Sequence, residues 1–151
     1  MEKILISKLK KLREKTQLPV SECKRALEKA KGDIKKAEEI LKEENKYYFE
    51  KRKDKKAKEG TIGIYLHFNG KIGAMVKLNC ETDFVAQNPI FKNLAHDLAM
   101  QIASSSSRTK KDLLNEPFIK NPKIKVQELI EDSIRKFGEN IQIEDFVKFE
   151  I

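Results

Sequence analysis

Cysteine and histidine are scarce in this 151-residue sequence, which contains two residues of each type. The cysteines, Cys23 and Cys80, fall in different modules of the chain, so they predict no disulfide framework and favour a reducing compartment. The histidines, His67 and His96, have no cysteine or second histidine at ligand spacing. We therefore expect no metal site.

Long apolar runs are also absent. No stretch approaches the roughly 18 consecutive apolar residues that a membrane-spanning helix needs. The first residues, Met1, Glu2 and Lys3, lead directly into a helical pattern rather than into a cleavable signal. We expect a cytoplasmic protein that does not contact a membrane, although a mature organellar protein would have the same features.

Catalytic motifs are missing as well. The sequence has no nucleophile-base motif, no zinc spacing and no glycine-rich phosphate loop before a helix. Lys71-Ile72-Gly73, which follows Asn69-Gly70, indicates a turn and not a Walker sequence. We predict that the protein is not an enzyme, that it needs no cofactor, and that another protein recognises its working surface.

Charged residues, in contrast, make up 37% of the sequence, and the formal net charge is +8. This balance suits acidic protein partners and nucleic acids equally well. Over residues 35–44 the lysines are interleaved with glutamates, a pattern typical of a solvated helix face. Charge alone therefore does not decide the class of partner.

The first 42 residues have the apolar periodicity of three short helices. The stretch Thr16-Gln17-Leu18-Pro19 separates the first helix from the second, and Gly32-Asp33 separates the second from the third. Residues 43–59 are almost entirely polar, which predicts a helical tail that fades into a charged linker. We therefore assign an N-terminal three-helix module to residues 1–42, a linker to 43–59 and a second module to 60–151.

The second module begins with a predicted β-hairpin, because apolar and polar residues alternate from Thr61 to Cys80 around Asn69-Gly70. The apolar residues on one side of each strand are Ile62, Ile64, Leu66 and Phe68 in the first, and Ile72, Ala74, Val76 and Leu78 in the second. A helix that starts at Pro89 has an apolar stripe to lay on the hairpin, formed by Ile90, Leu94, Leu98 and Ile102. A second amphipathic segment at 126–137 and a final strand at 141–151 complete an α+β core with an antiparallel sheet.

The most informative segment joins the hairpin to this helix. The apolar run ends at Cys80, and Asn88-Pro89 is a strong helix start, so Asp83 and Phe84 lie on a short connector. A phenylalanine there is either core filler or a protruding probe. Residue type alone favours the core, because most phenylalanines are buried.

The sequence of this segment resembles the signature of the elongation factor Ts family. The matching residues are Asn79-Cys80-Glu81-Thr82-Asp83-Phe84-Val85-Ala86. That family exchanges guanine nucleotide on elongation factor Tu, the GTPase that carries aminoacyl-tRNA to the ribosome. The resemblance extends over nearly the entire chain. Further matching stretches, in the order of the family, are Leu12-Arg13-Glu14-Lys15-Thr16, Cys23-Lys24-Arg25-Ala26-Leu27, Gly70-Lys71-Ile72-Gly73, residues 97–103, Pro117-Phe118-Ile119 and Gly138-Glu139-Asn140-Ile141.

The resemblance implies a guanine nucleotide exchange factor with an N-terminal bundle of ubiquitin-associated type. It implies that Thr82, Asp83, Phe84 and Val85 bind elongation factor Tu and dislocate Mg²⁺ beside its nucleotide. It also implies that N-terminal residues touch the GTPase domain, namely Arg13, Val20 and Ser21. Here the chain departs from the family, because many members have a glycine-rich turn and a methionine pair where this one has Gln17-Leu18-Pro19 and Val20-Ser21. Ser21 is also a candidate helix cap, and Val20 a candidate for bundle packing.

The resemblance also bears on assembly. Longer members contain two related core subdomains in tandem, whereas this chain has one hairpin-helix-strand unit after the linker. The resemblance to short bacterial or organellar members implies a homodimer that supplies the missing half. It requires no direct contact with nucleic acid.

Two other functions stay open at this stage. The net charge, together with Tyr47, Tyr48 and Phe49 among basic residues, would suit an RNA-binding module on ribosomes or tRNA. An adaptor for ubiquitin-like proteins would suit the N-terminal bundle but would leave the second module unexplained.

Overall fold

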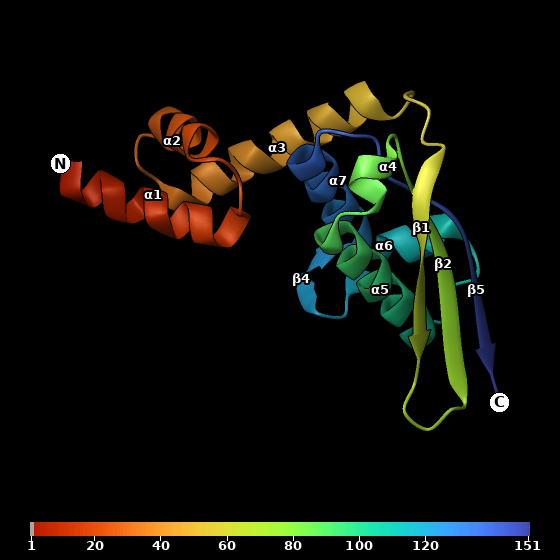
Figure 1. Cartoon of the computed structure of the whole chain (residues 1–151). Helices are drawn as coiled ribbons and strands as arrows, with labels where there is room; N and C mark the ends of the chain where they lie inside the picture. The colour runs from red at the N-terminus through yellow and green to blue at the C-terminus, as the bar shows by residue number, and fades with distance from the viewer. Residues whose placement is uncertain (1) are drawn as a thin grey trace. The chain divides into compact units, whose positions relative to one another are not determined.

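The structure of the chain is a computed structural model that describes residues 2–151, with side chains from Leu5 onward (Figure 1). It contains two compact units, an N-terminal unit, Met1–Tyr48, and a core unit, Phe49–Ile151. Helices and an antiparallel sheet occur together in the chain, so the predicted α+β fold class is confirmed. No helix within residues 2–151 combines the length and the apolar character needed to cross a membrane.

Three helices form the N-terminal unit: α1 (Glu2–Thr16), α2 (Val20–Lys29) and the first part of α3 (Ile34–Arg52). Their small core contains Leu12, Leu18, Cys23, Ala26, Leu27, Ala30, Ala37 and Leu41. The chain reverses at Gln17, with φ of 59°, and at Gly32, with φ of 85°, where the sequence indicated helix breaks. Helix α3 continues to Arg52, so residues 43–52, assigned from the sequence to the linker, are helical.

The core unit is built on a three-stranded antiparallel sheet of β1 (Glu59–Leu66), β2 (Ile72–Cys80) and β5 (Gln142–Glu150), in the order β1-β2-β5. The predicted hairpin and final strand are therefore present. Gly70 takes a positive φ of 70°, and the side chain of Asn69 accepts a hydrogen bond from the backbone N–H of Lys71. These two residues lie in the loop that joins β1 to β2, where the Asn-Gly pair predicted a turn.

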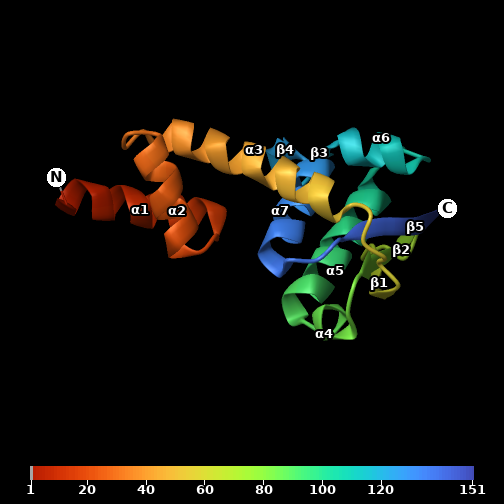
Figure 2. The same cartoon turned by 90° about the horizontal axis from the view of Figure 1, so that it is seen from above.

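Four helices and a two-stranded ribbon complete the core unit. The helices are α4 (Asp83–Ala86), α5 (Pro89–Ser104), α6 (Lys110–Asn115) and α7 (Val126–Phe137), and the ribbon pairs β3 (Pro117–Phe118) with β4 (Asn121–Lys125). Helices α5 and α7 lie on the same side of the sheet, as the view from above shows (Figure 2). The core forms on this inner side, where Val76 and Leu78 of β2 are buried with Phe91 and Leu98 of α5 and Ile134 of α7.

The close approach of α5 to β1 depends on Gly63. A Cβ atom at this position would lie 2.2 Å from the carbonyl oxygen of Ala95, which no side chain can accommodate. The inner side of β1 therefore has no room for a side chain at this position, whereas Tyr65, two residues further along the same side, packs against the core. Because side chains alternate along a strand, the apolar residues Ile62, Ile64 and Leu66 lie on the opposite side, where they are exposed.

The expected apolar stripe of α5 needs one correction. Leu94, Leu98 and Ile102 are buried as predicted, but Ile90 is 66% exposed. The neighbouring Phe91 fills the core in its place. The four-residue spacing assigned Ile90 to the stripe, but in the same first turn the helix presents Phe91 to the core and Ile90 to solvent.

Candidate functional site

The candidate site is the turn between β2 and α5, and its backbone is closely specified by short-range hydrogen bonds. Thr82 is the N-cap of α4, and its side-chain oxygen accepts a hydrogen bond from the backbone N–H of Val85 at 3.4 Å. Asn88 caps α5 by accepting from the N–H of Ile90 at 2.8 Å, ahead of Pro89 in the first turn. The helix start predicted at Asn88-Pro89 is present, and the predicted connector is itself a single helical turn.

This turn separates its side chains sharply between water and core. Val85 is 5% exposed and packs into the core of the unit, whereas Phe84 is 85% exposed. Asp83 is also exposed, and its carboxylate accepts from the side-chain amide of Gln87 at 3.3 Å. Phe84 is therefore a protruding side chain and not core filler. Val85 can therefore serve the site by anchoring the turn and not by offering its side chain to a partner.

Two glutamates hold the turn against a second loop of the core unit. The carboxylate of Glu139 accepts hydrogen bonds from the backbone N–H groups of Glu81 and Thr82, both at 3.0 Å, and from the Thr82 hydroxyl at 2.6 Å. In return, the carboxylate of Glu81 accepts from the backbone N–H of Asn140. We call the four residues Glu81, Thr82, Glu139 and Asn140 the clasp. In the sequence, Gly138-Glu139-Asn140-Ile141 is a family landmark with no local signal that connects it to the turn, because Thr82 lies 57 residues before Glu139.

Cys80, in the core of the unit, supports the turn. Burial, reinforced by the nearby charge of Glu139, raises the pKa of the Cys80 thiol to about 11. The thiol therefore stays protonated at neutral pH, and it donates to the carbonyl oxygen of Thr82 at 3.2 Å. Such a thiol is a structural group and not a nucleophile.

The three N-terminal candidates, Arg13, Val20 and Ser21, are all exposed on the N-terminal unit. Val20 is not part of the bundle core, which excludes ordinary packing as its role. Ser21 does not cap a helix, because α2 starts at Val20, its N-cap is Pro19, and no side chain caps it. Ser21, two residues after Pro19, was a candidate cap because the exact start of a helix is difficult to locate from a sequence.

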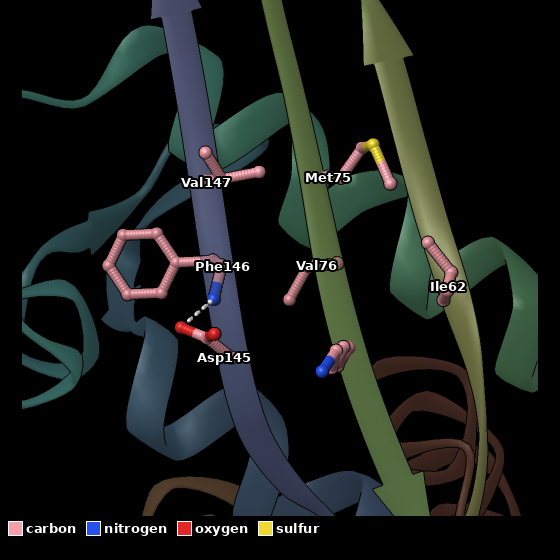
Figure 3. Close-up of a pocket in the computed structure, with 7 residues that line it drawn as sticks. Ile62, Met75, Val76, Asp145, Phe146 and Val147 are labelled. Atoms are coloured by element: carbon pink, nitrogen blue, oxygen red, sulfur yellow. Dashed lines mark hydrogen bonds between the residues drawn. The ribbon is translucent and has the colours of Figure 1, made fainter.

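A second exposed feature of the core unit is the sheet side opposite the helices. Strand register places Ile64 opposite Met75, and Met75 opposite Val147, so these side chains share one side of the sheet. We call this surface the outer face; its large apolar residues are Ile62, Ile64, Leu66, Met75, Val147 and Phe149. Ile62, Met75 and Val147 line the shallow hollow drawn in Figure 3.

Within residues 2–151, no group of three or more histidine, cysteine, aspartate or glutamate side chains is arranged to hold a metal ion. The exposed groups at the turn are the phenyl ring of Phe84, the carboxylate of Asp83 and the hydroxyl of Thr82, all on a fixed backbone. Groups of these kinds can recognise another protein by apolar and hydrogen-bonding contacts.

Comparisons with known proteins identify the class of the chain. The family model described as Elongation factor TS matches residues 81–151, which include the turn and the clasp. The chain is 38% identical over 187 aligned positions to elongation factor Ts of Thermodesulfovibrio yellowstonii, covering 95% of this chain and 94% of that protein. It is 37% identical to the protein of the same name from Carboxydothermus hydrogenoformans, covering 95% and 87%. It is 36% identical to the one from Gloeobacter violaceus, covering 99% and 89%.

These similarities define a translation elongation factor. The chain belongs to the elongation factor Ts family. The first of these alignments covers 187 positions against 151 residues, so the relative has segments that this chain lacks.

Proposed function

We propose that the protein binds elongation factor Tu in its GDP form and promotes GDP release by perturbing the Mg²⁺ and nucleotide site, so that GTP can bind. The observation that carries this proposal is the exposure of Phe84, at 85%, on a four-residue helix fixed at both ends. A large apolar ring held in water on a fixed backbone is a preformed anchor, and its burial in a partner would contribute about 1.5 to 3 kcal/mol.

The chemistry of the turn suits this task. Mg²⁺ in a GTPase requires nearly ideal octahedral geometry and bridges nucleotide phosphates to the protein, so a small displacement of its surroundings weakens nucleotide binding. Phe84 is a rigid anchor that can open a gap between elements of the partner, and Asp83 can accept hydrogen bonds from partner donors. A thousandfold faster release requires only about 4 kcal/mol of barrier reduction.

The N-terminal unit supplies a second contact in this proposal. Arg13, Val20 and Ser21 offer a guanidinium, an aliphatic side chain and a hydroxyl on the surface of α1 and α2. Two linked contacts raise the overall affinity through effective concentration. Because coupling between binding sites is reciprocal, nucleotide entering the partner must weaken the hold of the factor and so permit turnover.

We further propose that the protein acts as a homodimer through the outer face. Monomeric proteins rarely expose a contiguous apolar surface on three adjacent strands. A second copy is the occupant that this face fits, because the core unit has a single hairpin-helix-strand arrangement and a twofold axis would stack two identical sheets. On this view the protein is a non-enzymatic exchange factor of the cytoplasm that needs no cofactor and no nucleic acid.

The decisive experiment measures release of a fluorescent GDP analogue from elongation factor Tu with increasing amounts of the full chain. The expected result is a release rate that rises with the concentration of the chain and saturates. A release rate that does not change, together with RNA binding that falls steeply with salt, would instead favour an RNA-binding module.

A further inference from the structure

The clasp contains one side chain whose contacts all converge on the turn that presents Phe84. Glu139 lies between α7 and β5, and its carboxylate takes three hydrogen bonds, all from Glu81 and Thr82. Oxygen Oε1 receives the two backbone N–H groups and Oε2 receives the hydroxyl. Hydrogen bonds to an ionised carboxylate are stronger than neutral ones, so this side chain fixes both the backbone and the cap of the turn.

Helix α4 needs such support from outside. A helix of four residues has too few internal hydrogen bonds to form by itself. Its N-cap oxygen, Thr82 Oγ1, accepts from Val85 at 3.4 Å, a long contact, while the same hydroxyl donates to Glu139 at 2.6 Å. Glu139 therefore determines where the cap lies, and the cap determines where α4 begins.

Glu139 is itself held in place. The backbone N–H of the next residue, Asn140, donates to Glu81, and the buried side-chain amide of Asn140 donates to the carbonyl oxygen of Lys55 at 2.8 Å. The other oxygen of Glu81 lies 3.4 Å from Arg52 Nη1. Each of the two glutamates thus binds the backbone beside the other, and neither loop can shift without breaking bonds in both directions.

We propose that Glu139 is a positioning residue for nucleotide exchange, which acts through Thr82 to hold α4, and with it Phe84, in the orientation that enters the partner. This inference rests on the proposed function. It adds Glu139, which does not itself protrude at the tip of the turn, to the residues on which exchange depends. Its effect belongs to the step after binding, because an anchor misplaced by about 1 Å loses catalytic effect while other contacts still hold the partner.

The test measures the rate of GDP release against the concentration of the full-length protein for wild type, Glu139→Gln and Glu139→Ala. Loss of all three bonds in Glu139→Ala should lower the maximal rate about tenfold, while the half-saturating concentration stays within about twofold of wild type. Glu139→Gln keeps a carbonyl oxygen for the two N–H groups, so its maximal rate should lie between those of wild type and Glu139→Ala. Asp54→Asn is the matched control, since Asp54 is exposed and contributes no bond to the clasp.

A second measurement does not involve the partner. Amide hydrogen exchange at Glu81 and Thr82, followed by NMR, should speed up about tenfold or more in Glu139→Ala and remain unchanged in Asp54→Asn. If wild type does not accelerate GDP release, the proposed function itself fails. If wild type is active and Glu139→Ala reaches the same maximal rate, or loses only affinity, the positioning role is wrong. Folding is monitored by circular dichroism, and Glu139→Gln retains a test if the alanine variant unfolds.

Discussion

Large apolar side chains reach the surface of the core unit in two different ways. Phe84 is a single exposed ring on a one-turn helix, and the hydrogen bonds of the clasp fix the start of that helix. The outer face instead presents aliphatic and aromatic residues from three neighbouring strands of one sheet. A single rigid anchor suits a contact that forms and breaks in each cycle, whereas a broad apolar surface suits a lasting association. This difference supports the proposals that the turn contacts the GTPase and that the outer face contacts a second copy of the chain.

The largest effect is expected from a charge placed on the outer face. Ile64→Glu should convert the dimer into a monomer at micromolar concentration, because a twofold interface would bury the added carboxylate twice and unpaired charges are costly to bury. Light scattering would report a mass near 17.5 kDa for the variant and twice that for wild type. The melting temperature of wild type should also rise with protein concentration.

The matched control for this variant is Ile119→Glu. Ile119 is 40% exposed, is also in the core unit and does not belong to the outer face. It should remain dimeric. A wild-type protein that scatters as a monomer at high concentration would refute the homodimer, and an Ile64→Glu dimer would move the interface away from the outer face.

The next effect concerns the turn. Phe84→Ala should lower the maximal rate of GDP release by about thirtyfold or more, since truncation of a central aromatic anchor typically costs about 2 kcal/mol or more. The dimer and the melting temperature should not change, because the ring is exposed and packs against nothing in the core. Circular dichroism, light scattering and release of fluorescent GDP would be measured on the same sample.

Phe68→Ala is the control for Phe84→Ala, because Phe68 lies in the hairpin turn and is 93% exposed. It should keep its exchange activity. Equal activity of Phe84→Ala and wild type, or unfolding of Phe84→Ala, would show that the ring is not the anchor.

A smaller effect is expected from the N-terminal unit. The double variant Arg13→Ala, Val20→Ala should weaken binding to elongation factor Tu by about five- to tenfold, because exposed contacts each contribute of the order of 1 kcal/mol or less. The maximal exchange rate should be nearly unchanged, since the turn is intact. Titration calorimetry would measure the affinity, with Ile6→Ala as a control for loss of an exposed aliphatic side chain from α1. Unchanged affinity in the double variant would restrict the contact to the core unit.

The fold could be predicted in large part because its signals are local. The Asn69-Gly70 pair specified the hairpin, Asn88-Pro89 specified the start of α5, and Gly138, with φ of 69°, ended α7 where its amphipathic pattern stops. The clasp could not be predicted, because it joins residues 57 to 59 positions apart through bonds to backbone groups. The exposure of the outer face was equally hidden, because alternation gives the two sides of a strand without indicating which side a helix covers, and here Gly63 decides it.

The smallest effect is expected from a change at Glu116, which should lower stability and leave the turn and the outer face unchanged. Glu116 follows α6 and accepts hydrogen bonds from Ser105, Ser107 and, at 3.0 Å, the side-chain amide of Gln101. Burial alone would raise the pKa of this carboxyl, but these hydrogen bonds, with the charge of Lys148, outweigh it and hold the pKa below its ordinary value. A carboxyl whose pKa is lowered in the folded state stabilises the fold above its unfolded pKa, and this contribution is lost as the pH falls through the folded pKa.

The melting temperature of wild type should therefore fall as the pH drops below about 4.3, the ordinary pKa of a glutamate, and Glu116→Gln should remove part of that fall, leaving a protein that is less stable at pH 7 by about 1 kcal/mol. Its dimer and its exchange rate at pH 7 should match those of wild type, because the Glu116 carboxylate bonds to α5 and to the segment that follows it, away from the turn and the outer face. Thermal melts across this pH range, with Asp54→Asn as a control for an exposed acid, would measure the difference. A Glu116→Gln curve parallel to wild type at every pH would assign the acid sensitivity to other carboxylates. Loss of exchange in a folded Glu116→Gln dimer would show that the turn depends on a wider network than the clasp.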